Sequence, residues 1–352
     1  MADLRVTIGS LLLKNPVICA SGEHTLTDAG IRAGLAAGAA VVVAKSLNES
    51  EPARVQLAHT DYARVNQTWR IQPWHGPAAR HDMVLCRSGL QPRAFDDWLA
   101  AVAQLDREAA QQNAYVAASI ILAGLDAAVA MARAVEAAGV RLLEFNIGTP
   151  YGDEAKHGGV TTERSAERVR EVVTAVCGAV QIPVWVKLTG QSENVASLAQ
   201  AARAGGAAAV IMIGRSLGML PDLATMKPTL GTNLGYGGGW ALPITCYWLA
   251  RSRQALGAAY PLIGTNGARS GDDVARMLLA GASAVEMASV VMTNGFGVLK
   301  EAVTALERYC DQHGRAVSDL IGVAADQVAP FESQPYRPRH WEKFVPSETL
   351  GR

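Results

Sequence analysis

The hydrophobic residues of this chain gather in eight short runs that are rich in β-branched side chains and alternate little with polar residues. Continuous apolar runs of this length indicate strands buried on both faces, as the strands of a parallel sheet are. The predicted strands are Pro16–Ala20, Ala40–Lys45, Tyr115–Ile120, Leu142–Asn146, Val184–Leu188, Ala208–Ile213, Leu262–Gly264 and Ala284–Ala288.

Segments rich in Ala and Leu, with apolar residues at helical spacing, separate these runs. Several of them stop at an Ala-Gly pair, such as Ala37-Gly38 and Ala280-Gly281, which fits the preference for Gly just past a helix end. The predicted helices are Leu26–Ala37, Phe95–Gln112, Asp126–Ala138, Thr162–Val180, Glu193–Ala204, Pro243–Leu256, Asp272–Ala280 and Gly297–His313.

Strict alternation of eight strands with helices favours one closed (β/α)8 barrel, a TIM barrel, over an open doubly wound sheet. The first strand is not followed by a GxGxxG segment, which disfavours a dinucleotide-binding Rossmann domain. The barrel with its insertions is predicted to cover residues 1–313. Residues 314–352 are expected to form a C-terminal extension that packs on the barrel.

Two longer segments interrupt the alternation: residues 47–92 follow the second strand, and residues 221–240 follow the sixth. Loops after barrel strands lie at the carboxyl face, where active sites are built, so both segments are expected to cover the site. Five aromatic residues offer flat apolar surfaces to a ring or acyl group, although core packing is the commoner explanation for any one of them. They are Trp69, Trp74, Tyr151, Tyr236 and Trp240.

Composition narrows the class of protein. Lys plus Arg and Asp plus Glu both number 32, which argues against nucleic acid or an anionic membrane surface as the main partner. Neither a window long enough to span a membrane nor a signal-peptide layout is present in the sequence. The five cysteines are isolated, so no zinc or iron–sulfur ligand set and no disulfide framework are expected. The sequence predicts a soluble, cytoplasmic protein without a metal site.

The segment 261–290 carries the strongest chemical signal. A strand leads into a loop with Gly264 and Gly267, then an amphipathic helix, then a second strand that ends in Ala288-Ser289. Glycines let a backbone approach a ligand closely, and free N–H groups at a helix start attract an anion. The pattern resembles the phosphate grip after strands seven and eight of flavin-binding barrels. A pair of ordinary glycine turns is the alternative.

Seven stretches, in order along residues 15 to 300, resemble the dihydroorotate dehydrogenase family and its relative, the flavin domain of dihydropyrimidine dehydrogenase. They are Asn15-Pro16-Val17 with Ala20-Ser21-Gly22, Ala44-Lys45-Ser46, Glu144-Phe145-Asn146-Ile147-Gly148-Thr149-Pro150, Val186-Lys187-Leu188, Leu217-Gly218-Met219, Lys227-Pro228 and the segment 261–290.

The resemblance implies a barrel that binds FMN. The residues implied beside the flavin ring are Ala20, Ser21, Gly22, Lys45, Ser46, Asn146 and Lys187, and those implied at the ribityl phosphate are Gly239, Asn266, Gly267, Ala288 and Ser289. A lysine at a buried strand end needs an anionic partner, which a reduced flavin or its phosphate supplies. The alternative for each lysine is a pair with a structural carboxylate.

Departures from the family concentrate in the half that binds substrate. Thr149 stands where the family keeps its catalytic Cys or Ser base, and Tyr151 replaces the asparagine that ends the same loop. Cys86 and Pro92 replace two more asparagines, and Gly214-Arg215 replaces an Asn-Thr or Asn-Ser pair. A site built on hydrogen bonds rejects ligands that cannot make them, so these changes predict a substrate other than dihydroorotate.

The replacements suggest new roles. Arg215 is a candidate for binding a carboxylate, with Cys86 and Tyr151 as further substrate-binding candidates, and a surface salt bridge is the alternative for Arg215. Thr149 relays a proton but is a poor base without help, so His157 on the same loop and Lys45 are the other catalytic candidates.

Taken together, the residues and the resemblance predict an FMN-dependent oxidoreductase. It would move hydride between flavin N5 and a CH–CH bond of a small cyclic or unsaturated substrate. An unidentified electron partner and a homodimer are expected. The alternatives are a flavin enzyme without net redox chemistry, such as an isomerase or lyase, and a flavin- or ligand-binding protein that has lost catalysis.

Overall fold

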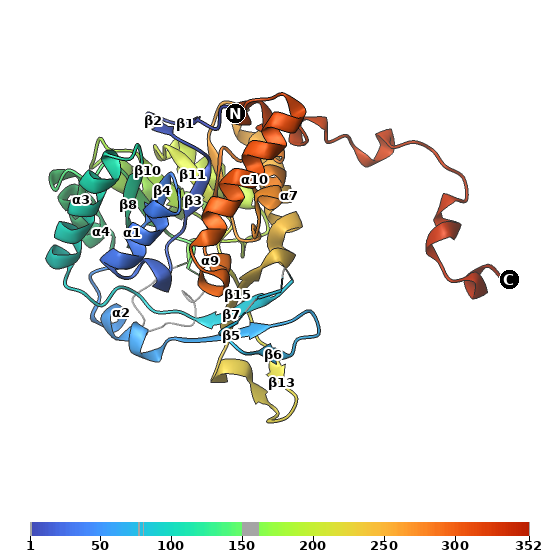
Figure 1. The fold of residues 1–352 in the computed structure, drawn as a ribbon, viewed down its shortest axis with the longest axis horizontal. Coiled ribbons are helices and arrows are strands. Elements are labelled where there is room, and N and C mark those ends of the chain that lie inside the picture. Colours follow the sequence, from blue (N-terminus) through green and yellow to red (C-terminus); the bar gives the residue numbers. More distant parts are fainter. Residues whose placement is uncertain (1, 77, 80, 150–161, 352) are drawn as a thin grey trace.

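A closed barrel of eight parallel strands forms the centre of the molecule (Figure 1). The computed structural model describes residues 2–76, 78–79, 81–149 and 162–351. In spatial order the barrel is β10-β11-β16-β17-β3-β4-β8-β9. These strands are β3 (Val17–Cys19), β4 (Val41–Val43), β8 (Tyr115–Ile121), β9 (Leu143–Asn146), β10 (Val184–Lys187), β11 (Ala209–Met212), β16 (Leu262–Thr265) and β17 (Ala284–Met287). Each lies within or overlaps one of the eight apolar runs, so the predicted (β/α)8 barrel is confirmed.

Helices cover the outside of the barrel, and their bounds follow the predicted segments closely. In α8, the Ser270 hydroxyl accepts the N–H of Asp273 at the helix start, and Val274, Met277 and Leu278 are buried on one face. This spacing of apolar residues turns a single stripe toward the strands. The barrel helices are α1 (Asp28–Ala36), α3 (Phe95–Ala110), α4 (Leu125–Ala137), α5 (Ala166–Cys177), α6 (Val195–Ala204), α7 (Leu242–Leu256), α8 (Gly271–Leu279), α9 (Ser289–Asn294) and α10 (Gly297–His313).

Strand register decides which residues meet at the carboxyl end of the barrel. Lys187 pairs with Asn146 on the neighbouring strand, and Glu286 pairs with Thr265. Parallel strands end at the same edge, so side chains at these positions are brought to one mouth.

The two insertions fold together into a five-stranded antiparallel sheet of order β12-β15-β7-β5-β6. Figure 1 shows β5, β7 and β15 crossing one end of the barrel. Apolar residues from both insertions, including Val65, Met83 and Leu234, form a small core of their own. The strands of this sheet are β5 (Asp61–Val65), β6 (Ile71–Gln72), β7 (Met83–Arg87), β12 (Ser216–Gly218) and β15 (Leu234–Gly238). The short helix α2 (Glu51–Val55) precedes β5, and β13 (Pro221–Asp222) and β14 (Lys227–Pro228) form a separate hairpin between β12 and β15.

The two ends of the chain lie away from this sheet (Figure 1). A hairpin of β1 (Val6–Ile8) and β2 (Leu11–Leu13) lies at the opposite end of the barrel. The first part of the C-terminal extension packs on the barrel through the buried residues Val317, Leu320 and Ala325, whereas residues 328–351 are almost entirely exposed and lead away from it. Within the described residues, each helix is too short or too polar to cross a membrane.

Candidate active site

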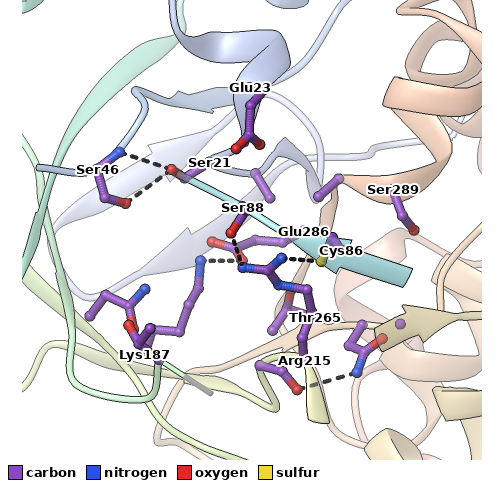
Figure 2. A pocket seen from close by; sticks show the side chains of 18 of the residues that line it. Ser21, Glu23, Ser46, Cys86, Ser88, Lys187, Arg215, Thr265, Glu286 and Ser289 are labelled. Atoms are coloured by element: carbon purple, nitrogen blue, oxygen red, sulfur yellow. Dashed lines mark hydrogen bonds and ion pairs between the residues drawn. The ribbon is translucent and has the colours of Figure 1, made fainter. Parts of the chain in front are cut away.

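A cavity of about 1180 Å³, open to solvent at its mouth, lies at the carboxyl ends of the barrel strands (Figure 2). Its walls combine residues that directly follow barrel strands with residues of the five-stranded sheet, so both insertions cover the site as predicted. The candidates from the sequence that line the cavity are Ala20, Ser21, Gly22, Lys45, Ser46, Cys86, Asn146, Thr149, Lys187, Arg215, Asn266, Gly267, Ala288 and Ser289.

One end of the cavity is made largely of backbone. Gly267 has φ +126°, and a Cβ added there would lie 2.7 Å from the backbone of Leu242 at the start of α7. The neighbouring Asn266 also has a positive φ of 68°, and its side chain links two segments. Its Oδ1 accepts the N–H of Gly238 at 3.3 Å and its Nδ2 donates to the carbonyl of Gly214 at 3.2 Å. The Asn266 side chain thereby holds together three segments at this end of the cavity, which contain Gly214, Gly238 and Gly267. We call this end of the cavity the cradle.

The glycines of this end have separate tasks. A Cβ at Gly237 would lie 2.9 Å from Asn266 Oδ1, so a residue with a side chain at position 237 would push the Asn266 side chain away. Gly264, in contrast, faces outward, where a Cβ would lie 2.8 Å from Met277 Sδ on α8. Gly264 therefore serves helix packing rather than ligand approach. Gly239, expected at the phosphate, does not line the cavity, whereas Gly237 does.

The loop after β9 brings Asn146 and Thr149 to the cavity. Asn146 Oδ1 accepts the N–H of Gly148 at 3.0 Å, and a Cβ at Gly148 would lie 2.4 Å from the backbone of Leu188. The loop therefore lies directly against the end of β10. The Thr149 hydroxyl is buried and has no hydrogen-bond partner among the described residues. Other atoms of Thr149 line the cavity.

Lys187, at the end of β10, lies between two buried carboxylates. Its Nζ is 2.8 Å from Glu144 Oε2 and 2.9 Å from Glu286 Oε2. Burial lowers the pKa of an amine, but the two carboxylates outweigh it and hold the pKa of Lys187 above its ordinary value. Burial, together with the charge of Glu144, raises the pKa of Glu286 to about 8. Lys187 therefore pairs with structural carboxylates, which was the alternative that the sequence left open, and it does so within the wall of the cavity.

Lys45 also pairs with a carboxylate. Its Nζ lies 3.2 Å from Glu23 Oε1, which further accepts the N–H of Gly89 at 3.0 Å, while the Tyr62 hydroxyl donates to Glu23 Oε2 at 2.5 Å. Burial lowers the pKa of Lys45, and the nearby Arg215 adds to this. Burial alone would raise the pKa of Glu23, but Lys45 and the Tyr62 hydroxyl bring it below its usual range. Glu23 is therefore ionised and joins the barrel to the sheet above it.

Arg215 reaches into the cavity from the segment between β11 and β12. Its guanidinium donates to Cys86 Sγ and to Ser88 Oγ, the latter at 2.9 Å (Figure 2). The Cys86 thiol in turn donates to the carbonyl of Gly235 at 3.2 Å. Arg215 is thus held over the cavity by Cys86 of β7 and by Ser88. The structure therefore places Arg215 in the cavity wall and not in a surface salt bridge.

Several candidates lie elsewhere. Trp69 is half exposed and Trp74 packs on Tyr62, while Tyr236 and Trp240 stack with ring centroids 4.4 Å apart; none of the four lines the cavity. Core packing therefore accounts for most of these aromatic residues. Tyr151 and His157 fall outside the described residues, so their roles remain predictions.

The sequence interpretation missed the carboxylates. Glu23, Glu144 and Glu286 are all buried or nearly so, and each pairs with a lysine of the cavity wall. A signal was present, because Glu144 and Glu286 stand inside apolar strands, where a charged side chain is costly without a partner. The hydroxyl of Ser119, inside β8, was missed as well.

These residues fit flavin mononucleotide. A phosphate needs backbone N–H groups that it can approach closely, and hydroxyl donors. Gly237 and Gly267 let a ligand approach the backbone, and Ser289 supplies a hydroxyl. A flavin ring needs a flat wall with small residues and a cation near it, which Ala20, Gly22 and Lys187 provide.

Comparison with known proteins agrees with this site. The sequence profile described as dihydroorotate dehydrogenase matches residues 72–309, more than half of the chain. The NAD(+)-type dihydroorotate dehydrogenase B catalytic subunits of Methanocella arvoryzae and Methanocaldococcus jannaschii are 29% and 26% identical over 90% and 91% of this chain, which is 96% and 98% of their own lengths. The fumarate-type dihydroorotate dehydrogenase A of Lactobacillus helveticus is 34% identical over 55% of this chain and 62% of its own. The chain therefore belongs to the dihydroorotate dehydrogenase family, whose enzymes are FMN-dependent oxidoreductases.

Proposed function

We propose that this chain oxidises or reduces a CH–CH bond of a small cyclic or unsaturated carboxylate other than dihydroorotate. When bound, FMN supplies hydride transfer at N5. The residues of the chain bind and orient the substrate and move its proton.

The observation that carries this proposal is the charge of the cavity. Among the described residues that line the cavity, the three cations Lys45, Lys187 and Arg215 face the two carboxylates Glu23 and Glu286. Lys45 and Arg215 also act on one another electrostatically. Charges interact strongly in a buried site, so an excess positive charge favours an anionic ligand. Arg215 suits a carboxylate because a guanidinium donates two parallel hydrogen bonds to it.

The proposed change of substrate rests on missing amides. Where the family has asparagines, Cys86 presents a thiol, Gly214 presents no side chain, and Pro92 does not line the cavity. A cyclic imide such as the dihydroorotate ring would lose hydrogen-bond partners here, and unmade bonds in a buried site weaken binding strongly.

Thr149 is our candidate for the proton step. Thr149 lines the cavity, and its buried hydroxyl has no partner among the described residues, which supports a role in binding the reacting end of a ligand. A hydroxyl needs a second group to accept its proton. His157, on the same loop, is the proposed proton acceptor. Lys45, which Glu23 holds as a cation, would help by stabilising negative charge that develops at the reacting end of the substrate.

The experiment is an anaerobic titration of the purified flavoprotein with matched pairs of compounds, each a cyclic or unsaturated carboxylic acid and its primary amide. The proposal expects the acid to change the oxidation state of the flavin at least tenfold faster than its amide. Equal rates for acid and amide would refute the carboxylate assignment. Conversion of substrate without any external acceptor would instead support the isomerase or lyase alternative.

The electron partner remains a proposal, since a separate protein or soluble oxidant must close the redox cycle. The homodimer and the cytoplasmic location also stay predictions. Light scattering of the purified protein tests the dimer directly, and a single-chain mass would contradict it.

A further inference from the structure

Two buried carboxylates share one ammonium inside the barrel wall. Glu144 on β9 and Glu286 on β17 are 0% and 1% exposed, and both contact Nζ of Lys187 on β10. The formal charges sum to one negative, because two carboxylates face one cation. An uncompensated buried charge is costly, and one proton bound between the carboxylates removes it.

The contacts of Glu286 fit a bound proton. Its Oε1 has no hydrogen-bond partner among the described residues, although it is fully buried. Glu144 Oε2 and Glu286 Oε2 lie 2.8 and 2.9 Å from the same Lys187 Nζ, so the two carboxyl groups are close neighbours, and two ionised carboxylates cannot donate to one another. The titratable groups that act on it from the packed strands are Lys187, Glu144 and the buried thiol of Cys19. Its raised pKa agrees with this arrangement.

A row of hydroxyls connects this pair to the cavity. Ser119 Oγ donates to Glu144 Oε1 at 2.8 Å and lies 2.7 Å from Ser46 Oγ, which is 3.0 Å from Ser21 Oγ. Each hydroxyl has a single proton to donate, so Ser46 donates to Ser119 and Ser21 donates to Ser46. Ser21 and Ser46 line the cavity (Figure 2). Ser119 is fully buried.

We propose that Glu144 and Glu286 form a buried proton-binding site, which holds one proton beside Lys187 and exchanges it with the cavity through Ser119, Ser46 and Ser21. A proton arriving at Ser21 moves each hydroxyl proton one place along the row and leaves one proton on the carboxyl pair. Departure reverses the same moves. No other bond forms or breaks, and the inference does not depend on the identity of the substrate.

Infrared spectroscopy of the full-length flavoprotein, with and without carbon-13 in the glutamate carboxyl groups, tests this site. We expect a protonated-carboxyl stretching band at neutral pH that shifts with the label. It should be lost in Glu286→Gln and kept in Glu23→Gln, which removes another buried glutamate that pairs with a lysine. Absence of the band in the unaltered protein, or its survival in Glu286→Gln, would overturn the proposal.

Glu144→Gln provides a second variant if Glu286→Gln does not fold. It leaves Glu286 alone with Lys187 as a simple ion pair, so the band should again be lost, and its persistence would contradict proton sharing. Ser119→Ala tests the path: the band should remain, but its exchange in deuterated water should slow at least tenfold. Unchanged exchange would remove the serine row from the proposal. Circular dichroism and flavin content confirm that each variant is folded.

Discussion

The two halves of the cavity are built in different ways. The half that fits the phosphate is made largely of backbone: the Asn266 side chain links neighbouring segments there, and Gly237 and Gly267 leave no room for a Cβ. The half that fits the substrate is made of long side chains, with Arg215 and Lys45 held by residues of the sheet or the opposite wall. Backbone shape restricts which residues a position tolerates, whereas side-chain chemistry changes with one substitution. We therefore expect substitutions to preserve cofactor binding in the first half more readily than substrate choice in the second half.

Gly267→Ala should have the largest effect, and it should fall on the cofactor half. A Cβ would lie 2.7 Å from the Leu242 backbone, at φ +126°. We expect flavin per chain to fall at least tenfold, measured by absorbance after desalting. Gly295→Ala is the control, because position 295 also has a positive φ, of 81°, but open space around it. With ψ at 171°, this control should lose about 1 to 3 kcal/mol of stability, because only glycine adopts that backbone conformation readily, but it should lose no flavin. Equal flavin loss in both variants would contradict the cradle.

Arg215→Met should affect only the substrate half. Loss of a half-buried cation that binds an anion costs a few kcal/mol, so we expect kcat/KM for the acid to fall about 100-fold with flavin content unchanged. The matched control is Arg87→Met on β7, whose guanidinium bonds backbone carbonyls and does not line the cavity. If both variants lost activity equally, Arg215 would be no more than a structural link.

Thr149→Ala should slow the proton step by about 100-fold, the lower range for a group that moves a proton in catalysis. Thr149→Ser keeps the hydroxyl and should retain most activity. Both variants should bind flavin normally, because the hydroxyl has no partner in the described structure. Turnover of Thr149→Ala at the original rate would transfer the role to His157.

Glu286→Gln should give the smallest effect, seen in the pH dependence of stability. The pKa of Glu286 is about 8 in the folded chain against 4.5 ordinarily. Between these values the folded chain holds a proton that the unfolded chain has released. The free energy of unfolding therefore falls as pH rises, by about 1 kcal/mol per pH unit. Denaturant titrations inside this window should show a flatter dependence in Glu286→Gln, and an unchanged slope would contradict the assignment.

The fold was predictable because local patterns specify it. Continuous apolar runs such as Ala208–Ile213 indicate buried parallel strands, and each found its place in the barrel. The phosphate end of the cavity was predictable in part, because the backbone conformation and close packing at position 267 require a glycine, which is visible in the sequence. Gly264 was misjudged because a glycine that packs against Met277 looks the same in the sequence as one that approaches a ligand.

The partners of the charged residues were not predictable. Arg215 bonds Cys86, 129 positions away in the chain, and Lys187 bonds glutamates on two other strands. Such pairs depend on barrel closure and strand register, which a single sequence does not display. A glutamate inside an apolar strand shows that a partner must exist without showing which residue it is.

The most direct test of the central claim, an unchanged cofactor site beside an altered substrate site, is anaerobic addition of dihydroorotate to the purified protein while its visible spectrum is followed. We predict flavin absorbance bands that dihydroorotate does not bleach within the time in which an accepted carboxylate substrate or a chemical reductant bleaches them. Rapid bleaching by dihydroorotate would contradict the proposed change of substrate, and a protein without flavin bands that takes up no added FMN would contradict the cofactor site.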